Sequence, residues 1–226
     1  MTSLTLLDWI ALGVFAACWI GYATVVDRVP RIRGRSVIAA MDEHRHRWMQ
    51  AMLGRENRIA DVATIGNLMN STSFLANTAI FILGGLVAML GSPELGARVF
   101  GVLPFAAAPD PVAWEMKVAL LLVIFVRAFF ELTWALRQFN YCCIVVGGIG
   151  QGADDPRWVR RAATAAKVAN RAARHFNSGL RAYYFGLAAL AWLLHPLALV
   201  AASLLVLHEL HRREFRSVVR EALQDR

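Results

Sequence analysis

Residues 124–141 read IFVRAFFELTWALRQFNY, an apolar run that is interrupted by charged side chains. The run is typical of a membrane-spanning helix, yet Arg127 and Glu131 lie four residues apart inside it. That spacing puts both side chains on one helix face, where an ion pair forms readily. Because a charge inside a membrane has a large desolvation cost, such a pair either holds helices together or serves a ligand or a pathway. The stretch therefore predicts an integral membrane fold and leaves both roles of the pair open.

The composition of the whole chain agrees with a membrane protein. Of the 226 residues, 58% are hydrophobic and only 18% are charged, and the mean hydropathy is positive. An ordinary soluble domain is less apolar than this. The net charge of +8 derives almost wholly from 22 arginines, which cluster between the apolar segments. Such clusters indicate a membrane face that contacts anionic lipid, and they argue against nucleic-acid binding.

Four apolar stretches are long enough to cross the hydrocarbon of a bilayer, which takes roughly 20 helical residues. They run from about 4–26, 65–90, 113–136 and 180–207. No polar segment between them is long enough to form a separate globular domain, so residues 1–226 are predicted to be a single integral membrane domain. The predicted fold is all-α: a polytopic membrane helical bundle of four or five spans with additional cytoplasmic amphipathic helices.

The distribution of Lys and Arg among the loops predicts the orientation. Residues 27–64 hold eight of these side chains and residues 150–179 hold six, whereas residues 91–112 hold only Arg98. The first and third loops are therefore expected in the cytoplasm and the N-terminus outside, in a bacterial inner membrane. The run after Asp155 and Pro156 is predicted to form a cytoplasmic helix that continues to Ser178–Gly179, and 36–53 is predicted to form another.

The last apolar stretch, 180–207, has two interpretations. A single crossing would place the arginine-rich tail outside, against the rule for positive charge. His195 and Pro196 lie near its middle, and proline disfavours a straight helix. A hairpin at this position returns the C-terminus to the cytoplasm, and we favour it over one long kinked helix.

A second polar pattern lies in the apolar stretch 65–90. Asn67, Asn70 and Asn77 recur at helical spacing and share one face, which cannot point at lipid without leaving amides unsatisfied. We expect this face to pack against the third helix, either bonding Glu131 or lining a hydrated cavity. Gly84 and Gly85 are expected to permit close helix approach.

Several further polar residues are candidates for a supporting role in the same site. They are Arg137, Gln138, Asn140, Arg181 and His195. His195 has no second histidine at equal depth with which to bind haem, and no cysteine or histidine pattern is typical of a metal site. We therefore expect no metal, no cofactor and no catalytic residues.

Four stretches carry a resemblance to a known family. They are RIADVATIGNLMNSTSFLANTAIFIL, FELTWALRQFNY, HFNSGLRAYYFGLAALAW and HRREFRS. Together they resemble a group of uncharacterised bacterial and plant membrane proteins, domain of unknown function 599, over about residues 5–217. The resemblance implies a multi-spanning membrane protein of unknown activity and supplies no catalytic residues.

Two function classes follow from these observations. The first is a small oligomeric channel or transporter-like protein, whose pathway would be the polar stripe of Arg127, Glu131 and the three asparagines. The alternative is a non-catalytic membrane subunit or scaffold that associates with a larger membrane complex. The expected partners are anionic lipid at the cytoplasmic face and either further copies of the chain or that complex. An enzyme is the least favoured class.

Overall fold

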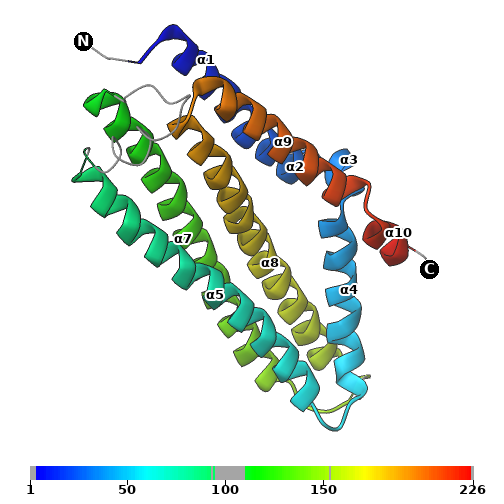
Figure 1. The fold of residues 1–226 in the computed structure, drawn as a ribbon. Helices are drawn as coiled ribbons and strands as arrows, with labels where there is room; N and C mark the ends of the chain where they lie inside the picture. Colours follow the sequence, from blue (N-terminus) through cyan, green and yellow to red (C-terminus); the bar gives the residue numbers. More distant parts are fainter. Residues whose placement is uncertain (1–3, 93, 95–109, 153, 225–226) are drawn as a thin grey trace.

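The computed structural model describes residues 4–92, 94, 110–152 and 154–224, and every regular element among them is a helix (Figure 1). The prediction of an all-α fold is confirmed. Most of the predicted outer loop 91–112, including Arg98, lies outside the described residues. In chain order the elements are α1 (Leu6–Ala16), the π-helical turn η1 (Ala17–Gly21), α2 (Tyr22–Arg28), α3 (Pro30–Arg33), α4 (Val37–Ala51), η2 (Met52–Gly54), α5 (Ile59–Leu90), α7 (Pro111–Gly147), α8 (Pro156–Leu190), η3 (Ala191–Leu193), α9 (Pro196–Phe215) and α10 (Val218–Gln224).

Three helical stretches of the described chain are long and apolar enough to cross a membrane. They are Leu6–Arg28, Ile59–Leu90 and Pro111–Gly147. Each contains most or all of one of the first three predicted apolar stretches. The chain is therefore compatible with a membrane protein, while the total of four or five spans stays a prediction.

The molecule is an elongated bundle with two unlike halves (Figure 1). Helices α5, α7 and α8 run along its full length, and α1, α2 and α9 lie beside the upper half. Helix α4 lies beside the lower half of α8 instead. At 1.5 Å per residue the three long helices measure roughly 48–55 Å, well beyond the roughly 30 Å of a hydrocarbon core. A bilayer would therefore embed only part of each long helix.

Helix α8 is longer than its sequence predicts. It begins as expected, because Asp155 accepts a hydrogen bond from the amide of Arg157 at 2.8 Å and Pro156 occupies the first turn. The sequence predicts a break at Ser178–Gly179, but the helix continues through these residues to Leu190. Gly179 does not end the helix, because it lies buried against α7.

The chain turns back after α8. Residues Ala191–Leu193 form a single 3-10 turn, and His195 then caps α9 by accepting the amide hydrogen of Leu197 at its ring Nδ1, at 3.1 Å. Pro196 follows at the first helical position, which suits its missing donor. Helices α8 and α9 run in opposite directions (Figure 1), so 180–207 has the hairpin arrangement and is not one kinked helix.

Small residues bring α7 and α8 close together. A Cβ atom added at Gly179 would lie 2.7 Å from Cγ of Leu132, and one added at Gly186 would lie 2.9 Å from the ring of Phe125. Both neighbours are buried and have little room to move. The close approach therefore depends on these glycines rather than on Gly84 and Gly85, which are exposed and whose added Cβ atoms would meet nothing within 4 Å.

We expect Gly179→Ala to destabilise the protein by about 1–2 kcal/mol, because overpacking a filled interface forces its side chains to shift. In mild detergent this should lower the melting temperature by about 2–8 °C. Gly84→Ala is the matched control, since the added methyl group has open space and alanine favours the helix. Equal melting temperatures for the two variants would contradict close packing at Gly179.

Candidate functional site

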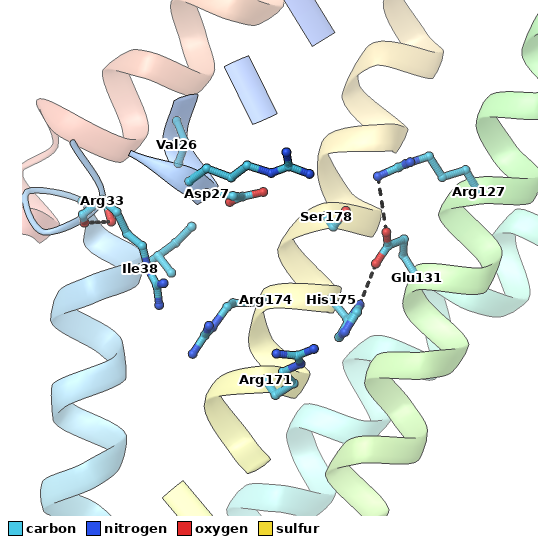
Figure 2. Close-up of a pocket in the computed structure, with 12 residues that line it drawn as sticks. Val26, Asp27, Arg33, Ile38, Arg127, Glu131, Arg171, Arg174, His175 and Ser178 are labelled. Carbon is cyan, nitrogen blue, oxygen red and sulfur yellow. Dashed lines mark hydrogen bonds and ion pairs between the residues drawn. The ribbon is translucent and has the colours of Figure 1, made fainter. Parts of the chain in front are cut away.

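A cavity of about 500 Å³ lies where the upper and lower halves of the bundle meet (Figure 2). It is lined by side chains of α2, of α7, of α8 and of the chain from α3 to the start of α4. Among the described residues that line it, five are arginines and only two, Asp27 and Glu131, are carboxylates. The arginines are Arg28, Arg33, Arg127, Arg171 and Arg174. The wall thus carries a surplus of three positive charges before any histidine is counted.

Glu131 connects two other side chains of the cavity wall, Arg127 and His175 (Figure 2). Its Oε1 accepts from Arg127 at 3.4 Å, and its Oε2 lies 2.8 Å from Nδ1 of His175 on α8. Arg127 also stands over the ring of Trp19, 5.8 Å from the centroid. The pair within α7 is long and its arginine is half exposed, so it contributes only about 0.3–0.5 kcal/mol. The stronger geometric link is the one between helices, from Glu131 to His175.

Asp27 also has a partner within the protein, Arg181. Its two carboxylate oxygens accept from Arg181 at 3.1 and 2.5 Å, a bidentate arrangement that joins α2 to α8. The side chain of Arg181 is only 9% exposed, whereas that of Asp27 is 48% exposed. Arg181 therefore acts on the cavity through Asp27, because it is not itself one of the lining residues.

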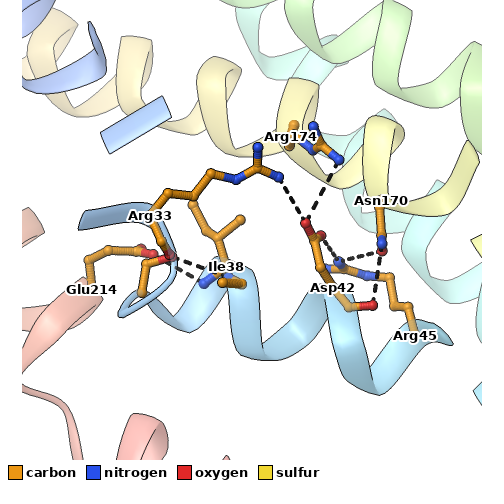
Figure 3. Close-up of polar contacts among 9 residues, drawn as sticks. Arg33, Ile38, Asp42, Arg45, Asn170, Arg174 and Glu214 are labelled. Carbon is orange, nitrogen blue, oxygen red and sulfur yellow. Dashed lines mark hydrogen bonds and ion pairs between the residues drawn. The ribbon is translucent and has the colours of Figure 1, made fainter. Parts of the chain in front are cut away.

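A network centred on Asp42 fixes α4 against α8 (Figure 3). The carboxylate lies 3.2 Å from Arg33, 3.1 Å from Arg45 and 3.8 Å from Arg174. Arg45 also donates to the side chain of Asn170 at 3.2 Å. Burial lowers the pKa of Arg45, and the nearby carboxylate of Asp42 opposes that shift. One carboxylate is thus shared by three arginines, and the network holds Arg33 and Arg174 at the cavity wall.

The end of α9 is tied to the start of α4 nearby. Glu214 accepts the amide hydrogen of Ile38 at 3.1 Å (Figure 3). Burial raises the pKa of Glu214, and its hydrogen bonds with Ile38 and Ser36 partly offset that shift. This contact joins α9 to Ile38, which lines the cavity.

Two cavity arginines lack a partner among the residues that the structure describes. Within the described ranges, the side chains of Arg28 and Arg171 make no hydrogen bond or ion pair, and Nε of Arg174 is buried without a partner. Guanidinium groups offer planar, charged donors that match carboxylate and phosphate oxygens. The arrangement is therefore chemically suited to hold an anion.

The structure separates the predicted polar stripe into two parts. Arg127 and Glu131 line the cavity, whereas the three asparagines lie on an exposed face of α5. Helix α5 packs through another face, which is built from small residues such as Ala76 and Ala79. The small residues let α5 lie closer to the bundle than the asparagine face would. The expected contact between the asparagines and Glu131 therefore does not form. The exposed residues are Asn67, Asn70 and Asn77.

None of the predicted supporting residues lines the cavity. Arg137 is exposed and donates to the hydroxyl of Tyr141 at 2.5 Å, and Asn140 is exposed on the same helix. Gln138 is buried, and its Oε1 has no partner among the described residues. His195 lies at the turn before α9, at the other end of the upper half.

Sequence reasoning missed the α8 side of the cavity. The four α8 residues that line the cavity follow each other at steps of three, one and three residues, so they share a helix face. They are Arg171, Arg174, His175 and Ser178. That spacing was readable from the sequence. The shared face is hard to recognise because these side chains belong to the positive charge between two apolar stretches and because the helix is predicted to stop at Ser178–Gly179.

No group of three or more histidine, cysteine, aspartate or glutamate side chains that could hold a metal ion occurs in the part of the chain that the structure describes. Comparisons with curated proteins and with solved structures find no match for this chain. A family model described as "Protein of unknown function, DUF599" matches residues 10–219, which is nearly the whole chain. The chain therefore belongs to the DUF599 family of proteins of unknown function.

Proposed function

We propose that this protein is a transporter-like membrane protein that binds a small anion in its arginine-lined cavity. The observation that carries the proposal is the excess of arginine around a space of about 500 Å³. Both carboxylates of the wall are already engaged, Asp27 by Arg181 and Glu131 by Arg127 and His175. Like charges gathered around one space repel each other, and a bound anion would offset that repulsion.

The position of the cavity supports an entry site at the inner membrane boundary. Asp27 and Arg28, which line it, are the last residues of the first candidate span. Arg127 lies sixteen residues after the start of α7, or roughly 24 Å along the helix. We place the upper half of the bundle in the bilayer, with the C-terminal part of α8 and the adjoining part of α9 as further spans. The arginine-rich lower half then faces the cytoplasm, as the distribution of positive charge favours.

The binding test uses the purified protein in mild non-ionic detergent at low salt, titrated with pyrophosphate in a calorimeter. We expect the wild type to bind and the double variant Arg171→Gln, Arg174→Gln to bind about tenfold more weakly, since both side chains are partly screened by solvent. The matched control is Arg160→Gln, Lys167→Gln, which removes two positive charges from exposed positions of α8 outside the cavity.

Two results would overturn anion binding at this cavity. One is a wild type that does not bind pyrophosphate. The other is an equal loss of affinity in both double variants, which would indicate general attraction to a basic protein. A stoichiometric second protein that co-purifies, together with absent binding, would favour the alternative function of a non-catalytic membrane subunit.

The asparagine face of α5 supports assembly of the protein with a second copy of itself. Its amides are exposed within a candidate span, and an amide of this face that lies in hydrocarbon has no partner there. An amide side chain both donates and accepts hydrogen bonds, so the same face on a second copy complements it around a two-fold axis. The exposed rings of Phe74 and Phe81 adjoin this face and would add apolar contact.

We expect the triple variant Asn67→Leu, Asn70→Leu, Asn77→Leu to dimerise about tenfold more weakly, at about 0.5 kcal/mol for each amide. Native mass spectrometry across a dilution series in detergent measures the change. Thr64→Val is the control, because Thr64 is exposed on α5 but bonds only a carbonyl of its own helix. A triple variant with an unchanged dimer fraction, or a wild type that is monomeric throughout, would contradict the asparagine interface.

A further inference from the structure

A second hollow lies on the side of the bundle away from α7, between α2 and α3 on one side and α9 and α10 on the other. Its volume is about 380 Å³. One wall is apolar and includes Val25 on α2, Ile32 on α3 and Phe215 at the end of α9. The apolar wall begins inside the first candidate span, Leu6–Arg28, and continues past its end.

The other wall is basic and is contributed by Arg35, Arg216 and Arg220. Among the described residues, the side chains of Arg35 and Arg216 make no hydrogen bond or ion pair. Arg220 is held in place because its Nη1 donates to the carbonyl oxygen of Phe215 at 3.0 Å, while its Nε is buried without a partner. No carboxylate is present among the described side chains that line the hollow.

The two walls together match one chemical class of ligand. Arginine donors bind phosphate oxygens, and an apolar wall that runs along a span can hold an acyl chain. A free phosphate ion would use the basic wall and leave the apolar wall exposed. A zwitterionic phospholipid would carry a choline or ethanolamine cation into a group of arginines. An anionic lipid satisfies both walls at once.

We propose that this hollow binds an anionic phospholipid of the inner leaflet, with its phosphate at Arg35, Arg216 and Arg220 and one acyl chain along Val25 and Ile32. The site is separate from the anion cavity, since Val26 is the only described residue that lines both. It shares with the proposed function only the placement of the membrane boundary near Arg28. Bound lipid would pin α10 against α2 at that level.

The test counts bound lipids by native mass spectrometry of the full chain in detergent. Equal amounts of phosphatidylglycerol and phosphatidylcholine are added. We expect the wild type to retain one phosphatidylglycerol preferentially. In the double variant Arg35→Gln, Arg220→Gln the preference for phosphatidylglycerol over phosphatidylcholine should fall roughly thirtyfold. Each basic side chain near an anionic surface raises the affinity about fivefold. Arg35→Lys, Arg220→Lys should keep most of it, which guards against a folding defect as the cause.

Further arms separate lipid from free phosphate and from the anion cavity. Glycerol phosphate at the same concentration as the lipid should displace little of it, because it cannot use the apolar wall. The charge-matched variant Arg160→Gln, Lys167→Gln should bind phosphatidylglycerol like the wild type. Pyrophosphate affinity should be unchanged in Arg35→Gln, Arg220→Gln, so a failure of either site is recognised separately.

Three outcomes would overturn the lipid site. The first is equal retention of both lipids by the wild type. The second is equal loss in the hollow and control variants, which would reduce the effect to net charge. The third is full displacement by equimolar glycerol phosphate, which would assign the hollow to a soluble phosphate.

Discussion

Asp27→Ala should lower the melting temperature of the protein in mild detergent by about 5–10 °C. The substitution leaves the guanidinium of Arg181 nearly buried without its carboxylate, and the pair is bidentate in the native protein. Removing one partner of a fully buried pair costs about 3–5 kcal/mol. Because Asp27 is half exposed, water replaces part of the interaction, and we expect about 2–3 kcal/mol.

The matched control for this prediction is Glu43→Ala. It breaks an exposed pair with Arg47 on α4, in which both side chains are more than half exposed. Such a pair contributes only about 0.3–0.5 kcal/mol. The double variant Asp27→Ala, Arg181→Met should recover most of the lost stability, since it removes both charges and keeps apolar volume. Equal melting temperatures for Asp27→Ala and Glu43→Ala would show that the pair does not stabilise the junction of α2 and α8.

The main features of the fold could be predicted from the sequence because they depend on local properties. The apolar runs of α5 and α7 are long enough to be recognised one at a time, and the helix starts at Pro156 and Pro196 follow from proline chemistry. The length of α8 could not be predicted in this way. Gly179 is compatible with a helix end or with close packing, and only the side chain of Leu132 on another helix decides between them.

The candidate site was only partly predictable for a similar reason. Arg127 and Glu131 are four residues apart, so their shared face is visible in the sequence. The partner His175 is 44 positions beyond Glu131 in the chain, and Arg181 is 154 positions beyond Asp27. Contacts over such separations depend on how helices pack.

The asparagines of α5 show the converse limit of sequence reasoning. Their spacing predicts a shared face, but periodicity does not say which neighbour a face meets. In the structure that face is exposed, and small residues take its expected place against the bundle. A polar face within an apolar helix therefore indicates that a partner is needed, without indicating that the partner lies in the same chain.

Substitution of Glu131 tests the proposed anion binding in the opposite direction, because it should raise the affinity for an anion instead of lowering it. Glu131→Gln should bind pyrophosphate about thirtyfold more tightly than the wild type. At an effective dielectric constant near 20, one charge about 6 Å away contributes up to about 3 kcal/mol, and partial exposure reduces this to about 2 kcal/mol. The side chain of Glu131 is 20% exposed, so its repulsion of an anion is less screened than the attraction of the more exposed arginines. Removing its charge also releases Arg127 and His175 to the ligand.

Calorimetry with the same detergent-purified protein measures this gain, and Glu43→Gln is the control because it removes one negative charge from α4 outside the cavity. A gain of equal size in both variants would assign the effect to net charge. A loss of affinity in Glu131→Gln would mean that the carboxylate's chief role is to position Arg127 and His175 for the ligand. The expected gain, confined to Glu131→Gln, would instead identify Glu131 as the charge that opposes the anion.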